Sequence, residues 1–176
     1  MTALEAVRDV GRVQAGQRVL VHGASGGVGS YAVQIAVALG AEVTAFCRTR
    51  HCEAARVLGA AHVFVDIVGG RRLKEIRGVL ERDGTYVAVG GPVDRTGLGF
   101  IVGLLARTVY GWFVPQRLAW FVTTPSRPLL EGLAELVDAG TLSAVIDRRC
   151  DLAEVPAVLA AQEAGTAGGK AVISVG

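Results

Sequence analysis

The chain has 176 residues, 51% of them hydrophobic, and a formal net charge of +2. This length suffices for one domain with a substantial core, and an apolar composition dominated by Ala and Val is typical of helices packed on a buried parallel sheet. The arginines are dispersed along the sequence, which argues against a basic face that would bind nucleic acid.

The first predicted element is a short helix over Thr2–Val10, opened by the capping-box spacing of Thr2 and Glu5. A strand at Val19–His22 then runs into the glycine-rich turn Gly23–Gly29, which is followed by a helix over residues 30–39. This order predicts an anion site, because the helix N-terminus offers unpaired N–H groups and glycines let a pyrophosphate approach the backbone. The alternative is an ordinary glycine-rich connection without a ligand.

Strand and helix patterns continue to alternate along the chain, which predicts a parallel, doubly wound α/β sheet of the Rossmann type. The apolar stretch Phe100–Val122 is interrupted by Arg107 and Pro115, so we expect a buried or interface-facing helical segment rather than a membrane span. The further expected strands are Glu42–Cys47, His62–Val68, Thr85–Val89, Val145–Ile146 and Ala171–Val175, and the expected helices are Glu53–Leu58, Leu73–Leu80, Leu129–Ala139 and Leu152–Ala164.

The end of the second strand indicates which dinucleotide the site prefers. An acidic residue at this point selects NAD through the ribose hydroxyls, whereas arginine suits the 2′-phosphate of NADP. The strand ends here in Arg48, Thr49 and Arg50, with no acid. We therefore expect NADP(H) in preference to NAD(H); the alternative is that both arginines are solvated surface charges.

The chain contains three cysteines that have neither the spacing of metal ligands nor that of a disulfide framework. We expect no bound metal and a reduced, cytoplasmic setting. These cysteines are Cys47, Cys52 and Cys150.

Ordered matches from Thr2 to Val175 resemble the nucleotide-binding part of the medium-chain dehydrogenase/reductase superfamily, and most of all its zinc-independent, quinone-oxidoreductase-like branch. The matching segments include residues 17–29, 58–60, 64–70, 84–90 and 169–175. The resemblance implies NADPH-dependent hydride transfer to a small quinone or enone, and it names no catalytic residue. The cofactor-binding residues that it implies are Ser25, Gly26, Gly27, Val28, Arg48, Thr49, Arg50, Val68, Gly69, Val89, Gly90, Gly91 and Lys170.

Two departures from this family pattern affect the expected architecture. Met1 stands almost where the family's N-terminal substrate domain would end, so residues 1–176 are expected to form a single dinucleotide-binding domain, with 141–176 matching the C-terminal return segment. A strand–helix unit is missing between residues 60 and 66. The expected strand order is then 2-1 followed by the former fourth strand, with helix Glu53–Leu58 on the opposite sheet face from the helix over residues 30–39.

Three interpretations of function stay open at the level of sequence. The chain is a quinone-reductase-type oxidoreductase, active alone or with a separately encoded catalytic domain; a dinucleotide-binding module without turnover; or a remnant that acts through protein contacts. A homodimer through Phe100–Val122 and the edge near Thr141–Ile146 is also expected from the resemblance.

Two other enzyme classes are disfavoured by the spacing of their catalytic residues. Short-chain dehydrogenases need a Tyr followed four residues later by Lys, and none of Tyr31, Tyr86 and Tyr110 has this neighbour. Ser25 lies in a glycine turn but lacks the glycine spacing of a hydrolase nucleophile elbow. His22, at a strand end, is expected to be a packed or capping residue rather than a proton donor.

Overall fold

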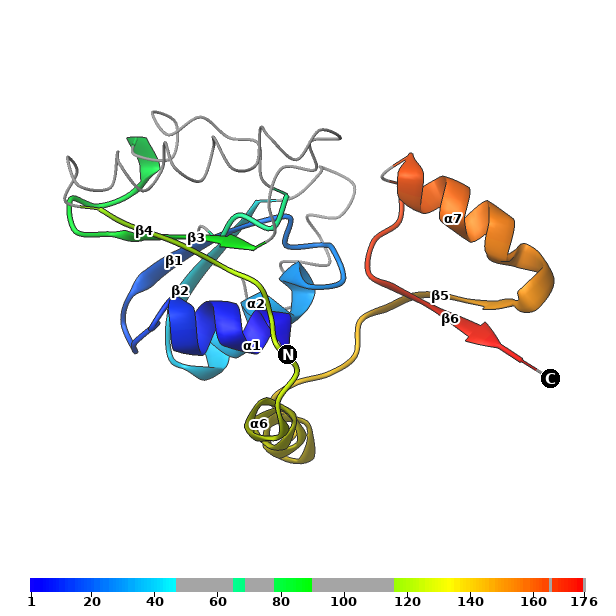
Figure 1. Ribbon diagram of the computed structural model, residues 1–176, viewed down its shortest axis with the longest axis horizontal. Helices are drawn as coiled ribbons and strands as arrows, with labels where there is room; N and C mark the ends of the chain where they lie inside the picture. The colour runs from blue at the N-terminus through cyan, green and yellow to red at the C-terminus, as the bar shows by residue number, and fades with distance from the viewer. Residues whose placement is uncertain (47–64, 69–77, 90–115, 165, 176) are drawn as a thin grey trace.

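The computed structural model describes residues 1–46, 65–68, 78–89, 116–164 and 166–175. These residues form a main sheet with its helices and a smaller C-terminal lobe (Figure 1). The predicted helix Glu53–Leu58, and with it the expectation about its sheet face, lies outside the described residues. So do the predicted site residues Arg48, Thr49, Arg50, Gly69, Gly90 and Gly91.

The main sheet is parallel and consists of two strand pairs joined by one residue. Strand β1 (Arg18–His22) pairs with β2 (Glu42–Phe46), and β3 (Thr85–Val89) pairs with β4 (Arg117–Phe121). Asp66 forms one parallel bridge to the end of β1 and another to β3. The resulting order, β2, β1, Asp66, β3, β4, is the order expected when the strand after β2 crosses to the other side of β1.

The N-terminal helix forms where the sequence predicts it, although its start differs. An α-helical turn, α1 (Thr2–Leu4), continues as the π-helix η1 (Glu5–Val10). The expected capping box is wrong, because Met1 is the N-cap and makes no side-chain hydrogen bond. The last carbonyl of η1, that of Val10, accepts a hydrogen bond of 2.9 Å from Nη1 of Arg117 at the start of β4.

Helix α2 (Gly29–Ala38) packs against the main sheet and forms the centre of the core. Its residues Val33 and Ile35 are almost fully buried, together with Val21 of β1 and Val43 of β2. The helix ends as the sequence predicts, because Gly40 adopts a φ of +79° that side-chain-bearing residues rarely take. The N-terminus of α2 lies at the carboxyl end of β1, because only the short turn of residues 23–28 joins the two (Figure 1).

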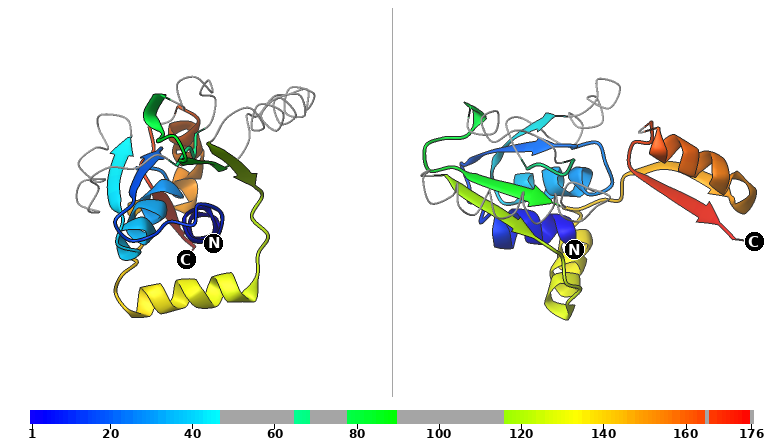
Figure 2. Two further views of the ribbon diagram at one scale, coloured as in Figure 1. Left: turned by 90° about the vertical axis from the view of Figure 1, so that its left-hand side faces the viewer. Right: turned by 45° about the horizontal axis from the view of Figure 1, so that its top comes forward.

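The expectation of a helical segment over Phe100–Val122 is wrong for the part that the structure describes, which contains strand β4. Residues Arg117–Phe121 pair with β3 in parallel, in the register Thr85 to Arg117. Aromatic residues favour strands, and Leu118 and Phe121 pack on the core. Pairing with β3 provides the hydrogen bonds of the backbone. Helix α6 (Arg127–Asp138) follows as predicted and lies outside the sheet in both views of Figure 2.

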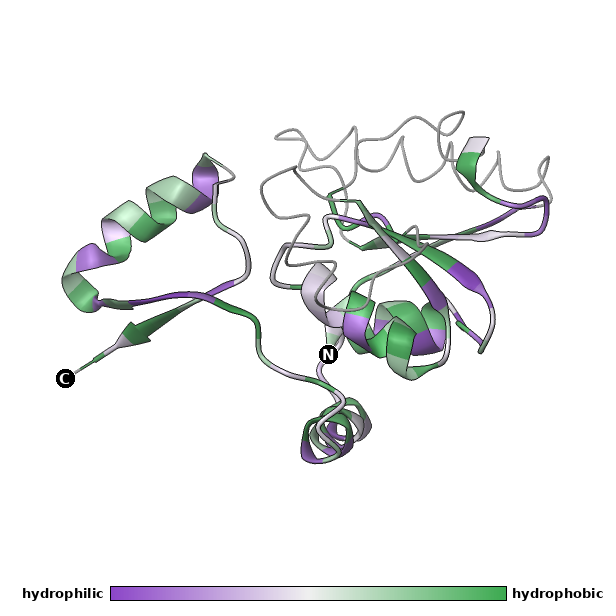
Figure 3. Cartoon of the chain, turned by 180° about the vertical axis from the view of Figure 1, so that it is seen from behind, coloured by the Kyte–Doolittle hydropathy of each residue, from purple (hydrophilic) through white to green (hydrophobic). Residues whose placement is uncertain are grey.

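The C-terminal lobe is a strand–helix–strand unit with its own sheet. Strand β5 (Ile146–Asp151) pairs in parallel with β6 (Lys170–Ser174), and the 3₁₀-helix η3 (Leu152–Glu154) and helix α7 (Val155–Glu163) connect them. Much of α7 and β6 consists of hydrophobic residues, as the hydropathy colours of Figure 3 show. Within the described residues, no helix is long and apolar enough to cross a membrane.

A polar clamp attaches the segment before this lobe to the core. The side chain of Gln34, on α2, donates a hydrogen bond of 3.1 Å to the carbonyl of Ser143 and accepts one of 2.8 Å from the amide of Ser143. Since Gln34 is buried, these bonds fix where the chain leaves the main body.

Candidate functional site

The glycine turn after β1 has a shape that only glycine permits at two positions. Gly23 has a φ of +86°, and its carbonyl accepts a hydrogen bond of 3.0 Å from the amide of Gly26. A Cβ atom at Gly29 would lie 2.1 Å from the carbonyl oxygen of Gly23. The first residue of α2 therefore packs directly on the start of the turn, which brings the helix N-terminus close to the end of β1.

The turn presents backbone N–H groups that suit an anion. Among the described residues, the amides of Gly27 and Val28 have no hydrogen-bond acceptor. Both precede α2, so they lie at the positive end of the helix dipole. Unpaired amides at a helix N-terminus are the arrangement that binds phosphate groups in nucleotide sites.

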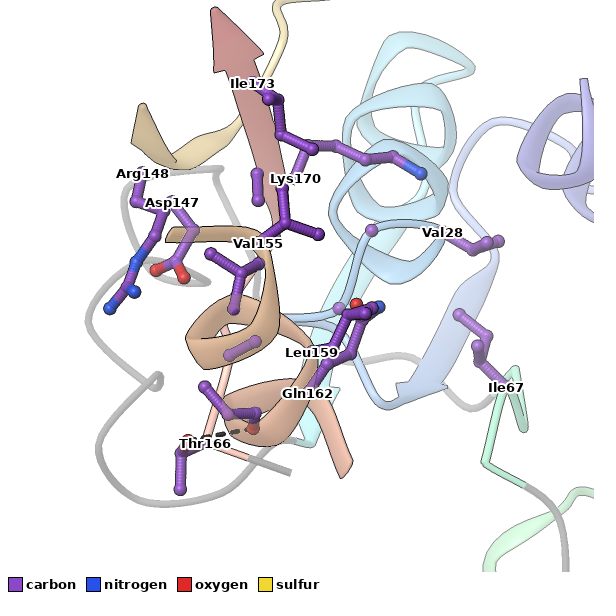
Figure 4. Close-up of a pocket in the computed structure, with 17 residues that line it drawn as sticks. Val28, Ile67, Asp147, Arg148, Val155, Leu159, Gln162, Thr166, Lys170 and Ile173 are labelled. Atoms are coloured by element: carbon purple, nitrogen blue, oxygen red, sulfur yellow. Dashed lines mark hydrogen bonds between the residues drawn. The ribbon is translucent and has the colours of Figure 1, made fainter. Parts of the chain in front are cut away.

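A cleft of about 490 Å³ lies between the turn and the C-terminal lobe (Figure 4). Its wall on the main body consists of Gly26, Gly27, Val28 and Ile67. The lobe contributes polar residues from β5 and aliphatic residues from α7, so the cleft can receive a ligand with both charged and flat apolar parts. These lobe residues include Asp147, Arg148, Val155, Leu159, Gln162 and Lys170.

Lys170 crosses the cleft from the first position of β6 toward the main body (Figure 4). Its Nζ lies 3.0 Å from the point where a Cβ of Gly27 would be. Among the described residues, Lys170 forms no ion pair or side-chain hydrogen bond. An ammonium group beside two unpaired amides gives this part of the cleft a positive potential.

The structure brings together some of the residues that the sequence predicts for the site. Gly26, Gly27, Val28 and Lys170 line the cleft. Three other predicted residues are described but do not line it. Ser25 belongs to the turn, Val68 is exposed, and Val89 is buried in the core.

Sequence reasoning missed the cleft residues of the lobe other than Lys170, and one residue beside the turn. Asp147 and Arg148 follow a weak strand pattern, and nothing in the local sequence shows that β5 faces the glycine turn. Ile67 could have been found, because it follows the bridging residue Asp66 and the carboxyl ends of parallel strands meet at one edge.

His22 takes the packed role that the sequence predicts rather than an open position in the cleft. Its Nδ1 lies 2.8 Å from Oδ1 of Asp66, and its ring lies 5.4 Å from that of Phe46. Asp66 is fully buried. The pair therefore lies in the sheet, beneath the turn.

Within the described part of the chain, no group of three or more His, Cys, Asp and Glu side chains gathers in a way that could hold a metal ion. The buried Cys150 has its Sγ 3.8 Å from the carbonyl of Val172. These residues offer no ligand set for zinc.

Comparisons with known proteins agree with the fold. The family model described as zinc-binding dehydrogenase matches residues 39–173. The chain is 34% identical to the mitochondrial NAD(P)H oxidoreductase RTN4IP1 of Mus musculus over 99% of its own length and 53% of that protein. The human protein of the same name is also 34% identical, over the same shares of both chains. The chain spans about half the length of these curated relatives.

Solved structures of similar fold cover nearly the whole chain. The quinone oxidoreductase of Coxiella burnetii is 25% identical with a TM-score of 0.78, and the match covers 99% of this chain and 57% of that one. An alcohol dehydrogenase superfamily protein of Novosphingobium aromaticivorans is 27% identical with a TM-score of 0.75, over 99% of this chain and 61% of the other.

Proposed function

This chain belongs to the zinc-binding dehydrogenase family within the medium-chain dehydrogenase/reductase superfamily, and from this membership we propose that it binds NADP(H) for hydride transfer to a quinone or an enone. The observation that carries the proposal is the cleft in which Lys170 faces Gly27 and Val28 of the glycine turn. The family's relatives include NAD(P)H oxidoreductases, which supports a nicotinamide cofactor.

The residues of the turn and the lobe would hold the cofactor by its pyrophosphate group. The amides of Gly27 and Val28 would donate hydrogen bonds to the pyrophosphate, and Lys170 would neutralise its charge from the other wall. When bound, the nicotinamide supplies the hydride, while the protein orients it and excludes water. The proposal assigns no step to zinc, since the three cysteines lack the spacing of metal ligands.

The proposal is tested first by binding and then by turnover. NADPH should raise the melting temperature of the chain, and more so at higher concentration, because a ligand that binds only the native state stabilises it with the logarithm of its concentration. Oxidation of NADPH with a small quinone or enone, followed by absorbance, separates an enzyme from a binding module. Absence of any shift with NADPH or NADH would leave the third interpretation, a protein that acts through contacts alone.

Preference for the phosphorylated cofactor is proposed to come from Arg48, Thr49 and Arg50, which lie outside the described residues. Replacing Arg48 and Arg50 together with Ala should weaken NADPH binding at least about tenfold, because charge-assisted hydrogen bonds to the 2′-phosphate are lost. NADH binding should stay the same, since that cofactor lacks the phosphate. Fluorescence titration with both dinucleotides measures the two dissociation constants.

A matched control for this pair is Arg12→Ala with Arg18→Ala, which removes the same charge from exposed positions in and before β1. This control should leave the ratio of NADPH to NADH affinity unchanged. An unchanged ratio in the Arg48 and Arg50 variant would assign the preference to other residues.

The C-terminal lobe is proposed to receive the substrate domain, which is either part of a longer chain or separately encoded. A two-stranded sheet is marginal by itself, and the lobe exposes Leu152 and Val175, which do not line the cleft. The edge at β4 is a second candidate surface, because Trp120 and Val122 are exposed there, and it would suit the homodimer expected from the sequence. The names of the relatives place those proteins in mitochondria, and a cytoplasmic setting for this chain stays a prediction.

A further inference from the structure

Asp66 is a carboxylic acid in a segment that is otherwise apolar. Its neighbours Val65 and Ile67 are the kind of residue expected in a strand of a buried parallel sheet. The side chain of Asp66 is fully buried all the same. Burial of a carboxyl group costs free energy unless hydrogen bonds replace those made with water, so packing alone does not account for this residue.

The carboxyl group joins side chains from the two strands that flank it. Oδ1 lies 2.8 Å from Nδ1 of His22, the last residue of β1, and Oδ2 accepts a hydrogen bond of 2.9 Å from the hydroxyl of Tyr86 on β3. The backbone of Asp66 bridges the same strands, at His22 and at Ala88. Asp66 therefore connects the two halves of the main sheet through both its backbone and its side chain.

The residues that follow this network lead into the wall of the cleft on the main body. His22 is followed by Gly23, which opens the glycine turn, and Asp66 is followed by Ile67, which lines the cleft. The turn and the segment after Asp66 lie against each other, since a Cβ atom at Gly23 would lie 2.9 Å from Cγ2 of Val68. The contact between Asp66 and His22, together with the backbone hydrogen bond of 3.1 Å from the amide of Ile67 to the carbonyl of His22, fixes the spacing between the turn and Ile67.

We propose that Asp66 is a positioning residue of the dinucleotide site, which holds the glycine turn and Ile67 in the arrangement that receives the cofactor. Donors that are fixed before binding need not be ordered when the ligand arrives, and this raises affinity. The identity of the ligand rests on the proposed function, whereas the ordering of the turn by Asp66 does not.

The test compares three variants of the full chain by amide hydrogen exchange without ligand and by NADPH titration. Asp66→Ala should increase exchange at the hydrogen-bonded amides of the turn, those of Gly23, Ala24 and Gly26, about tenfold and weaken NADPH binding about tenfold, because His22 and Tyr86 lose their shared partner. Asp66→Asn should keep both values close to those of the wild type. Its amide can accept a hydrogen bond from His22 and donate one to the hydroxyl oxygen of Tyr86. Tyr86→Phe removes the hydrogen bond to Oδ2 and leaves the contact with His22, so it should give an intermediate result.

Leu129→Ala is the control for a general loss of stability, because it removes a buried core side chain of α6 outside the network. Both measurements should stay within about twofold of the wild type in this control. Equal exchange over the turn in Asp66→Ala and Leu129→Ala would overturn the proposal. So would exchange in Asp66→Asn as fast as in Asp66→Ala. If the wild type binds neither dinucleotide, the proposed function fails, and the exchange comparison still decides whether Asp66 orders the turn.

Discussion

Gly29→Ala should remove dinucleotide binding and destabilise the whole chain. The new methyl group would lie 2.1 Å from the carbonyl oxygen of Gly23 and 2.7 Å from Cα of Ala24, and both are backbone atoms that cannot move aside as a side chain can. Either the turn or the first turn of α2 must shift. We expect a loss of about 3 kcal/mol in the free energy of unfolding, and a fall of about 10 °C in melting temperature. Thermal denaturation and NADPH titration measure the two effects.

Gly78→Ala is the matched control, because it makes the same chemical change at an exposed position. Among the residues that the structure describes, no atom lies within 4 Å of the added Cβ, and the backbone there has no positive φ. The change should stabilise the chain or leave it unaffected, within about 1 kcal/mol. Wild-type affinity for NADPH in Gly29→Ala would mean that the glycine turn is not the cofactor site.

Lys170→Gln should weaken binding of NADPH and of NADH by the same factor, about 30-fold, because the pyrophosphate is common to both cofactors and a hydrogen bond to a charged group is lost. The equal loss separates Lys170 from Arg48 and Arg50, whose replacement should affect NADPH alone. The salt dependence of the dissociation constant should also become weaker. Titration of both dinucleotides at two salt concentrations measures these quantities.

Two variants separate the position of this charge from its presence. Lys170→Arg keeps the charge at the cleft and should retain most of the affinity. Arg149→Gln removes one positive charge from the neighbouring strand β5, at an exposed residue that does not line the cleft. This second variant should leave both dissociation constants within about twofold of the wild type. A loss as large as that of Lys170→Gln would show that only the total charge of the lobe matters.

Much of the fold follows from local patterns in the sequence. Apolar runs bounded by glycines predict β1 and β3 correctly. The glycines alone predict the turn between β1 and α2. These features depend on residues that are neighbours in the chain. The strand at Arg117–Phe121 was predicted as helical because its aromatic and aliphatic residues fit either structure, and only pairing with β3 decides between them.

Only the part of the site on the glycine turn could be predicted from the sequence pattern. The glycine turn carries its own signal, whereas the opposite wall depends on where the C-terminal lobe packs. Lys170 was expected from resemblance to a family, and its place beside Gly27 is a tertiary contact that no spacing encodes. Asp66 was visible as a polar residue in an apolar strand, but the partners that give it meaning, His22 and Tyr86, come from two other strands.

The hydrogen bond from Arg117 to the last carbonyl of η1 has a consequence for the order in which the chain folds. The two residues are 107 positions apart, so the N-terminal helix emerges from the ribosome long before the residue that completes its end. Until β4 has been made and has paired with β3, the carbonyl of Val10 must be satisfied by water, as at any fraying helix end. The end of η1 is therefore completed only after β4 has been synthesised and has paired with β3.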